Sequence, residues 1–220
     1  FYLIASTMAA FWFRICNRGQ GTLAILCGFL AGSAMASKYT GLISVILPTA
    51  IVMTAGLVSN RRKDRPVDQT QPGSTINFRQ ALLLVTFYVL GIAFAIAPWL
   101  MRNLHDTGNP VYPLGYSVFG GDEWSSELNA RWKPAHGPAE HRLSEIPRHF
   151  LDAAVRNTWT SALLFALSVP SLLLWRRNRT LPILCCLIGW GFFTWWALTH
   201  RIDRFWIPVI PLLSLAAACS

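Results

Sequence analysis

The fold is decided by ALLLVTFYVLGIAFAIAPWLM, residues 81–101, a run of twenty-one residues without a charge. A helix of this length is long enough to cross the roughly 30 Å of hydrocarbon in a bilayer. The run ends in PWLMRN, residues 98–103, where a proline, an aromatic residue and an arginine indicate a membrane–water interface. A tight Gly-Asn-Pro turn follows in GNPVYP, residues 108–113. The sequence therefore predicts a transmembrane helix that leads into an aqueous segment.

The composition extends this prediction to the whole chain. Of the 220 residues, 53% are hydrophobic and only 13% are charged. A net charge of +9 would suggest nucleic-acid binding in a soluble protein, but here the basic residues cluster in short segments between apolar runs. This is the positive-inside pattern, so no nucleic acid is expected as a partner. The five cysteines lie in or beside apolar runs and are expected to be buried thiols without a disulfide framework: Cys16, Cys27, Cys185, Cys186 and Cys219.

Seven apolar runs predict an all-α, polytopic transmembrane helix bundle that forms a single membrane domain over residues 1–220. The runs are residues 1–13, 21–36, 41–58, 81–101, 161–175, 181–198 and the stretch after residue 205. The first and last runs are truncated, so we expect a fragment of a longer protein. One long helix with Lys38 at its centre is less favoured than two helices, because a central lysine costs about 2.5–3.5 kcal/mol on insertion scales.

The distribution of Lys and Arg predicts the orientation of the helices. Ten of the nineteen basic residues fall in three segments that are expected to face the cytoplasm: residues 14–20, 59–80 and 176–179. Lys38, the long loop 102–158 and residues 201–204 then face outward. Within this loop, apolar residues spaced three and four apart predict an amphipathic helix near residues 142–155, lying on the outer membrane surface.

Cations gather at three helix ends on the predicted outer face. They are Lys38 beside Tyr39, Arg102 beside Asn103, and Arg201 and Arg204 on either side of Asp203. Cations at the depth of lipid headgroups are suited to holding a phosphate or pyrophosphate group. The alternative is that each cation only anchors its helix end. Lys38 is the hardest to explain in that way, because it lies between two short apolar runs where a pocket or a partner is favoured over free solvent.

Three short segments carry a resemblance to a known family. They are GFLAGSAMASKYTG (residues 28–41), PWLMRN with GNPVYP (residues 98–103 and 108–113) and RFWIP (residues 204–208). These segments resemble bacterial glycosyltransferases of the GT-C fold, the superfamily of the protein O-mannosyltransferases and the aminoarabinose transferase of lipid A. The resemblance implies an integral-membrane enzyme that moves a sugar from a polyprenyl-phosphate carrier to a glycan, lipid or protein acceptor on the outer face, with inversion of the anomeric centre.

The resemblance also implies a site. Lys38 corresponds to the family's phosphate-binding lysine, and Arg204, with Arg201 close to it, is a further candidate for the same anion. The family's catalytic aspartate lies in the first outward loop, so it is expected upstream of Phe1. No cofactor is expected, because the lipid-linked sugar is a substrate, and no metal is expected, because members of the family often bind a divalent metal weakly or not at all. The expected location is the bacterial inner membrane. Residues that could line the substrate site are Tyr39, Arg102, Asn103, Asp122, Glu123 and Asp203.

Simpler interpretations and other functions stay open. Asp122 and Glu123, beside Trp124, could also belong to an ordinary solvated loop. A transporter or flippase for a lipid-linked or anionic substrate would place cations in the membrane too. It would be expected to show repeated halves, however, and the sequence has no internal repeat. A non-catalytic scaffold would leave Lys38 unexplained.

Overall fold

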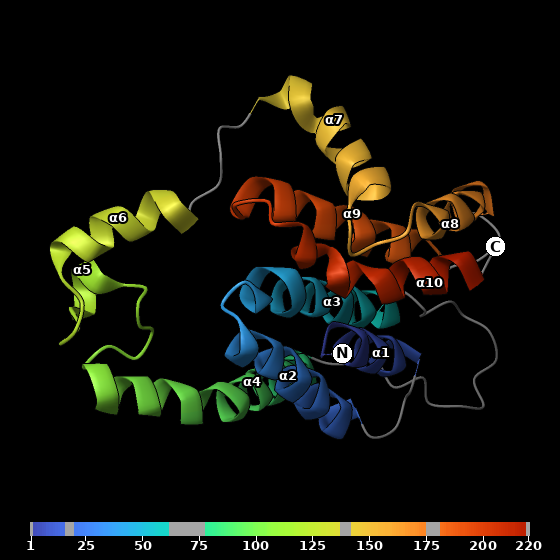
Figure 1. Cartoon of the computed structure of the whole chain (residues 1–220). Coiled ribbons are helices and arrows are strands. Elements are labelled where there is room, and N and C mark those ends of the chain that lie inside the picture. The colour runs from blue at the N-terminus through green and yellow to red at the C-terminus, as the bar shows by residue number, and fades with distance from the viewer. Residues whose placement is uncertain (1, 16–19, 62–77, 137–141, 175–180, 219–220) are drawn as a thin grey trace. The chain divides into compact units, whose positions relative to one another are not determined.

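The computed structural model describes residues 2–15, 20–61, 78–136, 142–174 and 181–218. Regular structure in these residues is helical, with no strand among them, which confirms the predicted all-α class. The chain divides into two compact units, Phe1–Gly115 and Tyr116–Ser220, and each has its own buried core. In Figure 1 the first unit runs from blue to green and the second from yellow-green to red.

The first unit is a bundle of apolar helices. They are α1 (Tyr2–Ile15), α2 (Gln20–Ser37), η1 (Leu42–Ile46), α3 (Leu47–Arg61) and α4 (Phe78–Thr107). Its core is rich in small side chains, among which Ala10, Ala24, Cys27 and Ala31 are fully buried. Small residues allow helix backbones to approach closely. Such packing drives the association of helices in a membrane, where the hydrophobic effect does not.

Helices α2 and α4 approach each other closely. A β-carbon on Gly28 would collide with the backbone carbonyl of Tyr88, and one on Gly91 would collide with the carbonyl of Ile25. Gly28 and Gly91 therefore allow the backbones of the two helices to pack closely. The order of the contacts shows the relative direction of the two helices. Gly28 meets Tyr88 and Gly32 meets Ile92, so residue numbers increase in the same direction along both helices. The two helices therefore run parallel, and their C-terminal ends lie at the same end of the unit.

The predicted break at Lys38 is confirmed. Helix α2 ends at Ser37, and the chain turns through Lys38, Tyr39 and Thr40 before it re-enters helical structure. The backbone N–H of Gly41 closes this turn by donating to the carbonyl of Lys38 at 2.8 Å. Lys38 consequently lies at the end of a helix and not in the middle of one.

The second unit holds shorter helices around an aromatic core. They are α5 (Tyr116–Phe119), α6 (Ser126–His136), η2 (Leu143–Glu145), α7 (Ile146–Leu151), η3 (Asp152–Arg156), α8 (Ala162–Leu174), α9 (Leu181–Leu198), η4 (Asp203–Val209) and α10 (Ile210–Ala218). Helix α10 packs on α8 and α9. Trp206 fills the centre, with ring contacts to Phe165, Phe192 and Trp195 at centroid distances of 5.5–6.0 Å. Trp195 and Trp196 are also buried in this core.

Three described helices are long and apolar enough to cross a membrane, by length and composition: α2, α4 and α9. Shorter apolar helices occur at Tyr2–Phe13 and Leu42–Leu57. Helix α4 exposes large apolar side chains, with Phe94 at 76% and Phe78 at 74%. Soluble proteins rarely leave so many such side chains in water, so this exposure favours a lipid environment for α4.

Within the predicted outward segment 102–158, α4 extends to Thr107, and α5, α6 and the helical run Leu143–Arg156 follow. That run covers the helix expected near residues 142–155, whose position on a membrane surface stays a prediction. Cys27 is buried as expected, but Cys185 is only half-buried and Cys186 is exposed, so burial was wrong for these two. Cys16, Cys219 and residues 176–179 lie outside the described residues.

Candidate functional site

The exit of α4 is built by local hydrogen bonds. Gly108 takes a left-handed conformation (φ 70°), and its N–H donates to the carbonyl of Leu104 at 3.0 Å, as is usual just after a helix end. Asn109 is fully buried and folds the turn that follows. Its side-chain oxygen accepts from the N–H of Val111 at 3.0 Å, and its side-chain nitrogen donates to the carbonyl of Leu114 at 2.8 Å. The Gly-Asn-Pro motif therefore forms the tight turn that the sequence predicted.

Tyr39 connects the end of α2 to the exit of α4. Its hydroxyl donates to the carbonyl oxygen of Tyr112 at 2.7 Å. Its ring lies edge-on to the ring of Trp99, with the centroids 4.9 Å apart. Asn103, one turn after Trp99, donates from its side chain to the carbonyl of Pro110 at 3.4 Å. The structure thus brings the Lys38-Tyr39 turn, the end of α4 and the turn after α4 into contact.

The surroundings of Tyr39 disfavour its ionised form. Partial burial raises the pKa of Tyr39 from 10.0 to about 12, and a hydrogen bond with the Asn103 side chain offsets part of this rise. The raised pKa keeps the hydroxyl protonated, and able to donate to the Tyr112 carbonyl, up to a higher pH than in an unperturbed tyrosine.

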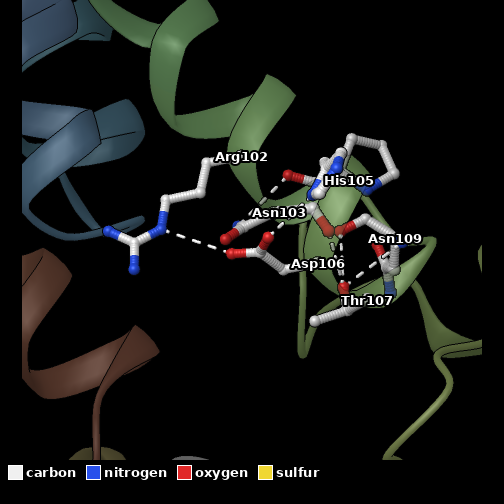
Figure 2. A network of polar contacts seen from close by, with 7 residues as sticks. Arg102, Asn103, His105, Asp106, Thr107 and Asn109 are labelled. Atoms are coloured by element: carbon white, nitrogen blue, oxygen red, sulfur yellow. Dashed lines mark hydrogen bonds and ion pairs between the residues drawn. The ribbon is translucent and has the colours of Figure 1, made fainter.

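Charged side chains surround this junction. Lys38 is exposed directly after α2. On the last turns of α4, Asp106 accepts from Arg102 Nε at 3.3 Å and lies 3.0 Å from Nδ1 of His105. Figure 2 shows Asp106 between these two partners, with the arginine side chain reaching away from the helix. Because α2 and α4 run parallel, Lys38 and this trio lie at the same end of the first unit.

In the second unit, Arg201 is held by internal contacts. Its Nε donates to the carbonyl of Trp196 at 3.1 Å, and its guanidinium lies 5.3 Å from the centroid of the Trp196 ring. Its Nη1 donates to Nε2 of His149 at 3.0 Å. Arg201 itself has a positive φ of 56°, and its N–H donates to the Thr199 hydroxyl at 3.1 Å. These contacts tie the end of α9 to α7.

The other expected site residues of the second unit are exposed. Arg204 lies with its guanidinium 6.0 Å from the ring centroid of Phe205. The backbone carbonyl of Asp203 accepts from the Asn157 side chain at 3.2 Å. Asp122 and Glu123 are exposed in the turn before α6. None of these contacts indicates a ligand.

The structure thus assigns the expected site residues to two groups. Lys38, Tyr39, Arg102 and Asn103 belong to the first unit, and Asp122, Glu123, Arg201, Asp203 and Arg204 belong to the second. The sequence did not indicate the residues that contact these side chains or shape the turns beside them. They are His105, Asp106, Asn109 and Tyr112 in the first unit, and His149 in the second. Asn109 and Tyr112 could have been found in the GNPVYP motif, but nothing in the sequence pairs His149 with Arg201.

The described residues contain no metal site, and comparison with other proteins identifies no ligand. Within the described parts of the chain, no three His, Cys, Asp or Glu side chains are close enough together to hold a metal ion. Comparisons with family models, curated proteins and solved structures found no match to this chain.

Proposed function

We propose that this chain belongs to an integral-membrane glycosyltransferase of the bacterial inner membrane, which takes a sugar from a polyprenyl-phosphate donor. In this proposal the seven apolar helical segments cross or enter the membrane. The ends of α2 and α4 then face outward, where the sugar is passed to a glycan, lipid or protein acceptor. The resemblance of residues 28–41 and 98–113 to GT-C enzymes supports the proposal.

One observation carries the proposal: the parallel packing of α2 on α4, fixed by Gly28 and Gly91, brings Lys38 and Arg102 to the same end of one bundle. Tyr39 then fastens the Lys38 turn to the exit of α4 through Tyr112. Two of the segments that resemble the family are thus in contact, although they are some sixty residues apart in the sequence.

The electrostatics of this end fit an anionic headgroup. Helix C-termini carry partial negative charge, so α2 and α4 alone would repel a phosphate there. Lys38 and Arg102 bring two formal positive charges to this end and Asp106 brings one negative charge, so a net formal charge of +1 counters part of this effect where the apolar run of α4 stops. Charge develops on the phosphate oxygen as the sugar departs, and a fixed cation at that oxygen would stabilise the transition state more than the ground state.

The test compares lysine variants of the intact protein in lipid vesicles. Lys38→Ala should lower sugar transfer from a polyprenyl-phosphate donor by about a hundredfold or more, the usual effect of removing a transition-state charge partner. Lys38→Arg should restore part of the rate, because the charge is kept but the shape differs. Lys63→Ala is the control, since Lys63 falls in the segment expected to face the cytoplasm, outside the described residues.

The outcomes separate the proposal from its rival. Wild-type transfer by folded Lys38→Ala protein would reject a donor-phosphate role for Lys38. If the wild type moves the lipid donor across the vesicle membrane without transferring its sugar, the chain belongs to a transporter or flippase instead.

A further inference from the structure

We propose that an apolar groove between α2 and α4 binds one acyl chain of a membrane phospholipid with an ethanolamine headgroup. The Arg102–Asp106 ion pair, beyond the outer end of this groove, binds the phosphate and the ammonium group of the same lipid. This phospholipid is distinct from the sugar donor, so the inference goes beyond the proposed function and does not depend on it.

The groove lies within the first unit, where α2 packs on α4. Its volume is about 720 Å³, which is in the range of sites that hold small ligands. It is lined by residues between Thr22 and Phe29 of α2 and between Leu90 and Ala97 of α4, and every lining side chain is apolar except that of Thr22. The rings of Phe29 and Phe94 form part of the wall, with their centroids 6.1 Å apart. Such a lining suits hydrocarbon and offers almost nothing to a polar ligand.

A flexible chain fits this groove better than another helix does. Side chains that line an empty space lose their dispersion contacts on that side, so an apolar group should fill the groove in a membrane. Two helices approach closely only where small residues meet. Phe94 is exposed beside the groove and would hold a straight helix, about 10 Å across, away from it. A single acyl chain can pass beside the ring.

The depth of the groove matches one leaflet of a bilayer. At 1.5 Å per residue, Ala97 lies about 8 Å and Leu90 about 18 Å along α4 from Arg102. Half of the hydrocarbon layer is about 15 Å thick. A chain that begins at the level of Arg102 therefore passes along the groove and ends near the midplane, as an ordinary acyl chain does. A polyprenyl chain is longer and would extend beyond the groove.

Arg102 borders the side of α4 that carries the groove. It is eight residues beyond Phe94, which places it about 80° around the helix axis from that ring. Asn103 is about 180° from Phe94 and contacts the turn after α4 through Pro110. The phospholipid and the Lys38 turn therefore meet different sides of α4.

The ion pair leaves donors available for a phosphate. Arg102 Nε donates to Asp106 Oδ2 at 3.3 Å, and both side chains are exposed. Figure 2 shows the guanidinium reaching away from the helix, with its two terminal nitrogens on the far side from Asp106. These nitrogens carry four N–H groups, and an arginine can bind a phosphate with two parallel hydrogen bonds.

The charges of the pair favour one kind of headgroup. Arg102 and Asp106 have opposite formal charges that cancel, so together they do not favour a lipid with a net negative charge. An ethanolamine headgroup presents a phosphate to Arg102 and an ammonium group with three N–H donors to the Asp106 carboxylate. A choline headgroup has no N–H to donate. Assigning this pair to the phospholipid leaves Lys38 as the cation for the donor phosphate.

The experiment labels the intact protein with a phospholipid that carries a photoreactive group near the end of one acyl chain. The protein is in detergent micelles, where detergent replaces loosely bound lipid, so a specific site is recognised by saturable labelling that the unlabelled phospholipid competes away. Three probes with identical chains carry ethanolamine, choline or glycerol headgroups. Peptide mass spectrometry locates the label.

The ethanolamine probe should label residues 22–29 and 90–97 and saturate near one lipid per protein. Ala93→Trp should remove most of this labelling, because it places a large ring in the groove at an exposed position. Val89→Trp is the matched control and should label as the wild type does, since Val89 is exposed on α4 but does not line the groove.

The headgroup contacts are tested separately. Arg102→Gln and Asp106→Asn should each weaken binding of the ethanolamine probe by up to about fivefold, the range expected for exposed ion pairs. In the wild type the choline and glycerol probes should bind more weakly than the ethanolamine probe. In Asp106→Asn the difference between the ethanolamine and choline probes should disappear.

Three results would overturn the inference. They are the absence of saturable labelling at these residues in folded wild-type protein, equal labelling of Ala93→Trp and the wild type, and equal binding of the three headgroups. Displacement of the probe by a polyprenyl phosphate, but not by unlabelled phospholipid, would also reject it and would assign the groove to the donor chain. None of these measurements uses sugar transfer, so a failure of the proposed function would leave this inference standing.

Discussion

The hydroxyl of Tyr39 donates a 2.7 Å hydrogen bond to the carbonyl of Tyr112, a residue 73 positions away in the sequence. This bond, with the edge-on contact between Tyr39 and Trp99, fastens the Lys38 turn to the exit of α4. The mobility of Lys38, and therefore its ability to hold a ligand in one place, should depend on these two contacts.

Tyr39→Phe should remove the hydrogen bond and keep the ring contact with Trp99. We expect a loss of about 1 kcal/mol in the free energy of unfolding, because the Tyr112 carbonyl loses the part-buried hydrogen bond that Tyr39 donates. The measurement is a denaturant titration in detergent, followed by helical circular dichroism. Tyr116→Phe is the control, since in the described residues the Tyr116 hydroxyl makes no hydrogen bond. Equal stability of the two variants would show that the bond contributes nothing.

The titration of Tyr39 should be displaced to high pH. Its pKa is raised from 10.0 to about 12, so the neutral form is favoured in the folded state. The resulting stabilisation is complete below about pH 10 and is lost as the pH rises through about 12, the value in the folded protein. A difference titration of tyrosinate absorbance between the wild type and Tyr39→Phe should show this late transition. A transition near pH 10 in folded protein would contradict the structure.

Gly28→Ala should disrupt the packing of α2 on α4. The added methyl group would meet the backbone carbonyl of Tyr88, which cannot rotate away as a side chain could. We expect a loss of about 1–3 kcal/mol in the free energy of unfolding, the usual penalty of overpacking. Gly189→Ala is a matched control, because a β-carbon there meets no atom within 4 Å. If both variants unfold at the same denaturant concentration, the close approach of α2 to α4 is not required.

The bond between Arg201 and His149 should be measurable by a double-mutant cycle. Arg201→Gln, His149→Leu and the double variant should give a coupling energy of about 0.5–3 kcal/mol, since the two side chains are in direct contact. The helical signal of the intact protein in detergent reports the unfolding. Arg204→Gln should change stability by less than about 0.5 kcal/mol, because that side chain is exposed. A coupling energy near zero would mean that Arg201 does not depend on His149.

The orientation of the helices can be tested by labelling in intact cells. A cysteine at Ser117 should react with a membrane-impermeant thiol reagent, and a cysteine at Gln69 should not. Ser117 is exposed, whereas the neighbouring Gly115 has a φ of 65° that disfavours a cysteine. Gln69 lies outside the described residues, so its expected protection follows from the distribution of basic residues alone. Reaction at Gln69 but not at Ser117 would invert the topology.

The sequence by itself determined where the long apolar helices lie. The run 81–101 reads as a spanning helix because hydropathy and length are properties of a local stretch, and α4 contains all of it. The break at Lys38 was equally local, since a charge and a following Gly41 interrupt the apolar pattern. The role of Gly28 in helix packing was also predictable, because glycine spaced four residues from another small residue favours close packing.

The tertiary structure decided the details on which the candidate site depends. Helix α4 continues through Arg102 to Thr107, although the sequence suggested an end at residue 101, because polar residues are compatible with a helix once it has left an apolar layer. Arg201 turns toward His149, and Tyr39 reaches Tyr112. These contacts join residues far apart in the chain, so they depend on how the helices of each unit pack against one another, and no local pattern of residues encodes that packing.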